Sequence, residues 1–172
     1  MKKLIVMLVL GMVSFGAMAV DGYKDAKFGI AEKEFLSKKL CNFEKVGNFP
    51  QMKEVTFYLC TDFLFADKKH GATALFLNGK FKRLDIIMDS RVLPLKGSLE
   101  RKYGTPSSMP SQEEIDNVKR NGGNVFMGFD GDTVRIELNV ERGKEYTALV
   151  YTDPDFGKVV QELTRRKLEK DI

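Results

Sequence analysis

A single histidine, His70, decides whether the two commonest kinds of nucleophilic catalysis are open to this protein. Ser/His/Asp and Cys/His catalysis both need an imidazole to take the proton of the nucleophile. His70 follows Lys68 and Lys69 and precedes Gly71, a pattern that indicates the tip of a solvent-exposed loop. The sequence places no nucleophilic serine turn and no acidic orienting residue beside it. We therefore predict no catalytic residues.

Carboxylates could also do chemistry, because a pair of them can supply a general acid and a general base. Two short pairs are present, Asp130 with Asp132 and Asp153 with Asp155. The first pair is explained by a hairpin turn and the second by a helix cap. The first stretch also offers too few oxygen ligands for a calcium loop, so we predict no metal site. If the protein were a hydrolase, Asp130 and Asp132 would be the residues to substitute first.

Two cysteines, Cys41 and Cys60, are the only candidates for thiol chemistry. In an oxidising compartment they would form a disulfide that closes a loop of roughly 20 residues and contributes about 3 kcal/mol. Two buried free thiols are the alternative. Zinc is disfavoured, because a structural zinc site needs four ligands and the chain has one histidine.

Residues 1–19 have the order of a secretory signal peptide: two lysines, an apolar run and small residues. Ala17 and Ala19 precede the predicted cleavage site at Val20. An uncleaved anchor is the alternative, but the apolar run is shorter than the roughly 20 residues that a spanning helix needs. The residue directly after the site is Val20 and not a cysteine that could carry a lipid, and no later segment is apolar enough to span a bilayer. We predict a periplasmic or secreted mature chain, residues 20–172.

Charge and motif content argue against two classes of partner. Loss of the two lysines of the signal peptide leaves 26 of the 28 basic residues against 24 acidic ones, a net charge of +2. These charges are interspersed, so we predict no nucleic-acid partner. The glycines lack the spacing of a phosphate loop or a dinucleotide fingerprint, so we predict no cofactor.

The elements that must position these residues follow from hydrophobic periodicity. Helical spacing appears in residues 30–40, in residues 93–103 and after Asp153. Strand-like patterns appear in residues 55–65, 72–77, 80–88, 125–129, 133–140 and 145–152. Asn78-Gly79 between two of these segments is the strongest hairpin signal in the chain.

This order predicts an α+β fold in which hairpins build an antiparallel sheet, with two or three helices packed on one face. Residues 20–172 would form a single domain. Residues 105–124, rich in small and polar residues, are predicted to be a mobile connection with one helical turn from Gln112. The connection is a possible functional loop or only a tether between two groups of strands.

Aromatic residues are concentrated in the predicted strands, where they would form the core or line a ligand pocket. They are Tyr58, Phe63, Phe65, Phe76, Phe81, Phe126 and Phe129.

A basic cluster at residues 165–167 ends the terminal helix, where positive charge suits the helix dipole. Its alternative role is contact with anionic lipid headgroups.

Three short motifs resemble small secreted bacterial proteins of the β-lactamase-inhibitor-protein-like architecture, a group that includes small outer-membrane assembly lipoproteins. The motifs are Phe28-Gly29-Ile30 before an acidic helix, Asn78-Gly79-Lys80, and Leu99-x-x-Lys102-Tyr103-Gly104-x-Pro106. The resemblance covers residues 28–106 and implies helices on one face of an antiparallel sheet and action through protein binding. The chain departs from the lipoproteins because it lacks a lipidated cysteine, and no functional residue carries over.

Three functions are compatible with the sequence. The first is a non-enzymatic protein-binding module, an inhibitor or envelope accessory whose partner is another envelope or secreted protein. The alternative is a carrier or sensor of a small apolar or lipidic ligand held between the sheet and the helices. The third is a carboxylate-based hydrolase. The scarcity of catalytic groups favours binding over catalysis.

Overall fold

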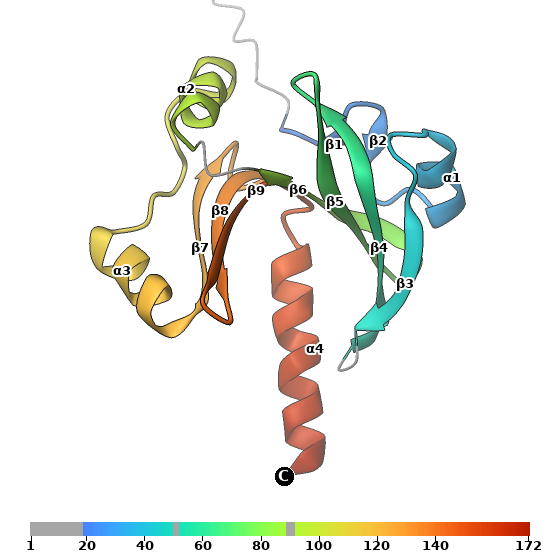
Figure 1. Ribbon diagram of the computed structural model, residues 1–172. Coiled ribbons are helices and arrows are strands. Elements are labelled where there is room, and N and C mark those ends of the chain that lie inside the picture. Colours follow the sequence, from blue (N-terminus) through green and yellow to red (C-terminus); the bar gives the residue numbers. More distant parts are fainter. Residues whose placement is uncertain (1–18, 50–51, 89–91) are drawn as a thin grey trace, which may run out of the picture.

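The computed structural model describes residues 19–49, 52–88 and 92–172, and residues 1–18 of the predicted signal peptide lie outside these ranges. Within them, seven strands form one antiparallel sheet in the order β3-β4-β5-β6-β9-β8-β7 (Figure 1). The strands are β3 (Glu44–Phe49), β4 (Met52–Phe65), β5 (Lys68–Leu77), β6 (Lys80–Met88), β7 (Gly123–Phe129), β8 (Val134–Glu141) and β9 (Lys144–Thr152). A small ribbon is formed by β1 (Gly22–Tyr23) and β2 (Ala26–Lys27). The helices are α1 (Glu32–Ser37), α2 (Val92–Tyr103), α3 (Gln112–Asn121) and α4 (Phe156–Asp171). These elements confirm the α+β class and the antiparallel sheet.

Two-residue turns join β5 to β6 and β8 to β9. Asn78 and Gly79 connect β5 to β6 with φ angles of 49° and 71°, the left-handed conformation that the sequence predicts there. Arg142 and Gly143 connect β8 to β9 in the same way, with φ angles of 51° and 76°. The two halves of the sheet meet where β6 pairs with β9, so strands that are far apart in the chain become neighbours.

One face of the sheet is covered by α1, α2 and the β1–β2 ribbon. The ring of Phe35 in α1 packs against Phe76 and Phe81, with centroid distances of 5.3 and 4.4 Å. Leu95 and Leu99 of α2 join the same apolar cluster. This face therefore holds the main hydrophobic core.

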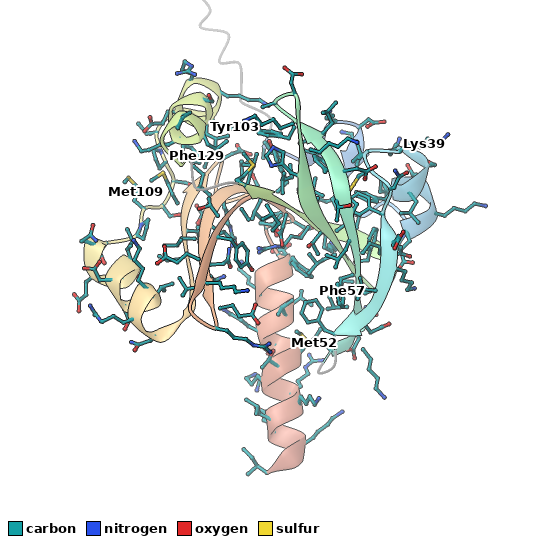
Figure 2. The ribbon with its side chains drawn as sticks, viewed as in Figure 1. Lys39, Met52, Phe57, Tyr103, Met109 and Phe129 are labelled. Atoms are coloured by element: carbon teal, nitrogen blue, oxygen red, sulfur yellow. A yellow bond between two sulfur atoms is a disulfide. The ribbon has the colours of Figure 1, made fainter. Side chains whose placement is uncertain are left out.

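The opposite face of the sheet is packed by α4. Phe156 and Val160 contact Val55 and Leu75 there, and Met52 and Phe57 belong to the same cluster (Figure 2). The prediction that the helices share one face is therefore not confirmed. The physical reason is that β4 and β5 carry apolar residues on both faces, and each face needs a cover.

Residues 112–121 form the helix α3, where the sequence predicts a mobile connection with a single helical turn. Ser111 and Glu114 make a reciprocal capping box that begins the helix, and Gly122 ends it with a φ angle of 79°. Val118 is the buried residue of α3. The Ser-x-x-Glu pattern is a helix-start signal. The helix has few apolar residues, so its hydrophobic periodicity is too weak to predict its full length.

A disulfide joins Cys41 to Cys60, the pairing that the sequence predicts. It links the segment after α1 to the middle of β4, across a sequence separation of 19 residues. The half-buried Cys41 and the buried Cys60 both belong to the main core. The cross-link therefore fixes the chain segment that covers the first face.

The terminal helix α4 extends well beyond the sheet (Figure 1). After Leu163 the described side chains of α4 are exposed, and Leu168 keeps 60% of its surface in solvent. Among the helices in the described part of the chain, none is both long and apolar enough to cross a membrane. Only the first turns of α4 therefore contribute to the packing of the domain.

Candidate ligand-binding pocket

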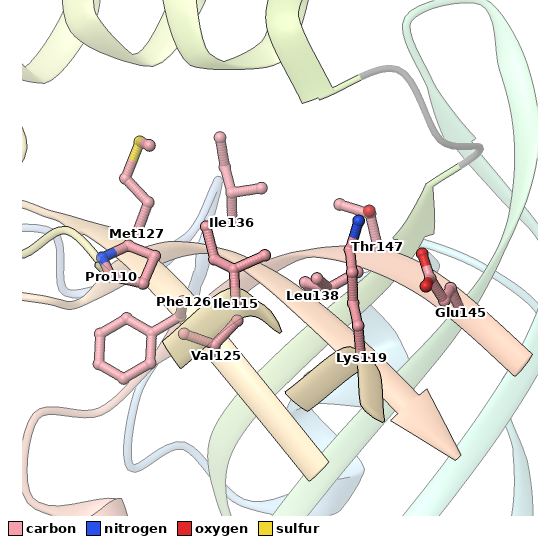
Figure 3. Close-up of a pocket in the computed structure, with 10 residues that line it drawn as sticks. All are labelled: Pro110, Ile115, Lys119, Val125, Phe126, Met127, Ile136, Leu138, Glu145 and Thr147. Carbon is pink, nitrogen blue, oxygen red and sulfur yellow. The ribbon is translucent and has the colours of Figure 1, made fainter. Parts of the chain in front are cut away.

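A pocket of about 330 Å³ lies between α3 and the sheet strands β7, β8 and β9 (Figure 3). Its lining comes from four elements and the segment before α3. The lining residues are Pro110, Ile115, Lys119, Val125, Phe126, Met127, Ile136, Leu138, Glu145 and Thr147. The volume falls at the lower end of the range that small-molecule sites occupy, about 300 to 1,000 Å³.

The floor of the pocket is an apolar part of the sheet that the helices leave partly open. Val125 pairs with Leu138, and Met127 pairs with Ile136, across the β7–β8 ladder. Residues that are directly opposite each other in an antiparallel pair point to the same face. Ile136 is buried, while the other three are half-buried. The floor therefore offers apolar surface that water still reaches.

The connection that leads to α3 is held by a clasp around Gly128. The backbone N–H of Ser107 donates to the Gly128 carbonyl at 2.8 Å, and the N–H of Gly128 donates to the Ser108 carbonyl at 3.0 Å. Both serine hydroxyls donate to Oδ1 of Asp132, at 2.6 and 2.8 Å. This clasp positions Pro110 and α3 over the edge of the sheet.

We expect Gly128→Ala to destabilise the clasp, because a Cβ at this position would lie 1.9 Å from Asp132 Oδ1 and 2.6 Å from Ser108 Oγ. Moving these groups aside would break charge-assisted hydrogen bonds, at a cost of about 2 kcal/mol in unfolding free energy. Urea denaturation measures this loss. The matched control is Gly157→Ala in α4, where a Cβ meets nothing within 4 Å. A Gly128→Ala protein as stable as the Gly157→Ala protein would contradict this role of the clasp.

The rim of the pocket carries two charges of opposite sign. Lys119 on α3 and Glu145 on β9 are both exposed, whereas Thr147 beside them is buried. Figure 3 shows Lys119 and Glu145 at the same end of the pocket. Neither of them forms an ion pair with another residue in the described ranges. A polar head group of a ligand could therefore find a charged partner at this end.

On the opposite face of the same strands lies a cluster of four charged residues. Arg83 donates from Nη2 to Glu137 Oε2 at 2.6 Å and from Nε to Asp85 Oδ1 at 2.7 Å. Arg135 Nη1 lies 3.7 Å from Glu137 Oε1, and its guanidinium lies 4.2 Å from the ring centre of Phe126. The charges balance within the cluster. The ion pairs link β6 to β8 across the intervening strand β9.

Burial shifts the protonation equilibria of this charged cluster. It raises the pKa of the Asp85 carboxyl to about 6, although the neighbouring Arg83 acts in the opposite direction. Burial also opposes the charge of Arg83, but the carboxylates of Asp85 and Glu137 raise the pKa of its guanidinium overall. Glu137 is 1% exposed, and its Oε1 has no hydrogen-bond partner among the described residues. The sequence predicts strands at residues 80–88 and 133–140 but carries no signal that their charged residues meet.

His70 lies within β5 and not at the tip of a loop, so its predicted location is wrong. Its Nδ1 is 3.1 Å from the carbonyl oxygen of Ile87, and its ring contacts that of Phe65. The loop signal from the two preceding lysines was misleading, because lysines also occupy exposed positions at the start of a strand. The contacts of His70 with Ile87 and Phe65 are packing contacts of a strand residue.

Asp130 and Asp132 lie in the turn between β7 and β8, and each carboxylate is held by structural hydrogen bonds. Oδ2 of Asp130 accepts from Thr133 Oγ1 at 2.8 Å, and Asp132 accepts from the clasp serines. Asp153 pairs with Lys82 Nζ at 2.7 Å, and α4 begins after Asp155. The structure therefore uses these acids for turns and pairing, as the sequence had indicated for the turn.

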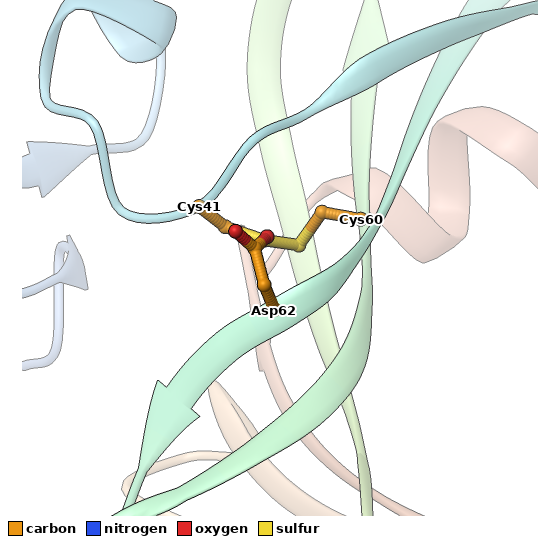
Figure 4. A group of neighbouring side chains, drawn as sticks. All are labelled: Cys41, Cys60 and Asp62. Atoms are coloured by element: carbon orange, nitrogen blue, oxygen red, sulfur yellow. A yellow bond between two sulfur atoms is a disulfide. The ribbon is translucent and has the colours of Figure 1, made fainter.

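Cys41, Cys60 and Asp62 form a group whose potential ligand atoms all lie within 4.8 Å of one another (Figure 4). The two sulfur atoms are bonded to each other, so neither is a thiolate that could bind a metal. Asp62 accepts hydrogen bonds from the backbone and side-chain nitrogens of Asn42. The group therefore anchors the segment after α1.

Comparison with known proteins places the chain among relatives without an assigned activity. A family model described as "Uncharacterised protein" matches residues 23–171. An uncharacterised protein of Haemophilus influenzae is 34% identical over 164 residues, which covers 92% of this chain and 91% of the relative. No solved structure matches the chain. These matches show no link to the β-lactamase-inhibitor-protein-like architecture.

Proposed function

We propose that this chain, which belongs to the uncharacterised family matched over residues 23–171, is a non-enzymatic binding protein that holds a small amphipathic ligand beside α3. The observation that supports the proposal is the apolar pocket floor, which α3 borders but does not cover. A disulfide is typical of proteins that work in oxidising compartments, so we place this function outside the cytoplasm, in the periplasm or in the secreted fraction.

The chemistry of the pocket defines the class of ligand. Half-buried Val125, Met127 and Leu138 would lose contact with water when an apolar chain or ring covers them. Each apolar side chain that becomes fully buried contributes about 1.5–3 kcal/mol. Lys119 and Glu145 at the rim would hold a polar head group. The small volume favours a short acyl chain or a single ring.

The decisive experiment is titration of the mature protein with decanoate, decanol and decyltrimethylammonium, which share one apolar chain and differ in head-group charge. Isothermal calorimetry would report the affinity, and NMR shifts would report the location. We expect binding with shifts confined to α3, β7, β8 and the start of β9, and the preferred head group would show whether Lys119 or Glu145 recognises it.

We expect Met127→Gln to weaken this binding about tenfold, because it places a polar amide in the apolar floor. The matched control is Met109→Gln, since Met109 is 61% exposed and does not line the pocket. It should leave the affinity unchanged. Equal affinities of the two variants, or no binding of any of the three compounds to the unmodified protein, would contradict the proposal.

Binding of a protein partner is the second candidate function, and the exposed apolar positions of α4 favour it. The helix extends beyond the sheet with Val159 and Leu168 exposed, while its charges pair internally between Glu162 and both Arg165 and Arg166. Such internal pairing lowers the cost of covering the helix with another protein. The occupant would be an envelope or secreted protein that packs against the apolar positions of α4.

A further inference from the structure

Val20, the first residue of the predicted mature chain, is tied to a turn 110 residues away. Its backbone nitrogen donates to Oδ2 of Asp130 at 2.5 Å, in a half-buried position. Asp130 begins the turn between β7 and β8 with a φ angle of 51°. The same carboxylate oxygen accepts from Thr133 Oγ1 at 2.8 Å. The carboxylate is therefore already oriented towards the Val20 nitrogen.

Gly22, Tyr23 and Ala26, which follow Val20, are packed against the domain, while the residues between them are exposed. Tyr23 and Ala26 of the β1–β2 ribbon are buried, and the ring of Tyr23 contacts those of Phe63 and Tyr151 at 5.5 and 4.9 Å. Ala19, in contrast, is exposed. Packing of the chain against the domain thus begins within the first few residues of the predicted mature chain.

We propose that Asp130 is the receptor for the new amino terminus that processing creates at Val20. Hydrolysis of the Ala19–Val20 peptide bond consumes one water: the hydroxyl joins the Ala19 carbonyl carbon, and a proton joins the Val20 nitrogen. The free amine then takes a further proton from solvent and becomes an α-ammonium group, the usual form below its normal pKa of about 8. The neutral N–H donor to Asp130 becomes a charged one.

The hydrogen bond to Asp130 would gain strength from an ammonium donor, against the repulsion of Lys24, Lys27 and Lys102, which line the neighbouring cavity. A charge-assisted hydrogen bond is roughly twice as strong as a neutral one. A cavity of about 630 Å³ lies beside Val20 and is lined also by Ala19, Tyr103 and Tyr151. It would give the remaining protons of the ammonium access to water. Processing would thus strengthen the link between the start of the chain and the β7–β8 turn, independently of the proposed pocket.

The first test is the amino-terminal sequence of the exported protein, by mass spectrometry. We expect it to begin at Val20, and any other terminus would overturn the proposal. The second test compares the unfolding of chain 20–172 with that of chain 17–172, which keeps the Val20 amide and moves the ammonium three residues away. We expect the folding constant of the longer chain to be about five- to tenfold smaller, because its hydrogen bond to Asp130 comes from a neutral donor.

A double-mutant cycle assigns this difference to the ion pair. In an Asp130→Asn background, which keeps an acceptor oxygen but removes the charge, the two chains should differ by less than about twofold. The matched control is Asp21→Asn, since Asp21 is exposed and pairs with Lys27. Asp21→Asn should leave the difference in folding constant between the two chains unchanged. Equal stabilities of the two chains with Asp130 intact, or an unchanged difference in the Asp130→Asn background, would refute the proposal.

Discussion

Glu137→Leu is expected to lower the free energy of unfolding by about 3–5 kcal/mol, because it removes one partner from a buried ion pair. Glu137 is 1% exposed, and its carboxylate accepts from Arg83 at 2.6 Å. Leucine fills a similar volume but leaves Arg83 with only Asp85 as a counter-charge. Urea denaturation of the two proteins at neutral pH would measure the loss.

The control for this prediction removes both partners. In the double variant Arg83→Met/Glu137→Leu, the uncompensated charge is gone, so we expect most of the stability to return. Glu162→Leu on α4 removes an exposed carboxylate that also binds arginines, and it should change stability little. A double variant less stable than Glu137→Leu alone would show that the ion pair is not the cause.

Removal of the disulfide should have an effect of comparable size. The double variant Cys41→Ala/Cys60→Ala opens a loop of roughly 20 residues in the unfolded chain, and we expect a loss of about 3 kcal/mol in unfolding free energy. Because the bond also anchors the segment that covers the core, folding at about 37 °C should become marginal. Denaturation with and without a reducing agent measures this contribution.

The control compares the effect of the reducing agent on the unmodified protein with its effect on the double variant. The reducing agent should destabilise the unmodified protein by about as much as the double substitution does, and it should leave the double variant unchanged. If the unmodified protein unfolds at the same urea concentration in both conditions, the disulfide makes no contribution. Such stability under reducing conditions would also weaken the argument for an oxidising compartment.

The charged cluster and the pocket are connected through β8. Strand alternation directs Ile136 and Leu138 to the pocket floor and Arg135 and Glu137 to the opposite face. The buried ion pairs therefore hold the strand that carries the floor. One face of β8 thus carries the pocket floor, and its other face carries the charge pairs.

Local sequence determined the elements that depend on short-range signals. The Asn78-Gly79 turn, the alternation in residues 133–140 and the pairing of two cysteines could each be predicted, because turn conformation, strand period and cysteine count are readable within a short window. The α+β class followed from the order of these elements. The Ser111-x-x-Glu114 capping box of α3 is also a short-range signal, whereas the prediction here is only a single helical turn from Gln112.

Only the tertiary structure decided which surfaces meet. The pairing of β6 with β9, the placement of α4 on the second face and the position of α3 beside the pocket all depend on contacts between residues far apart in the chain. Such contacts are chosen by the total burial that they achieve, which no short window contains. For the same reason the charged cluster and the Val20–Asp130 contact were invisible in the sequence: each is formed by groups that carry no local signal until the sheet brings them together.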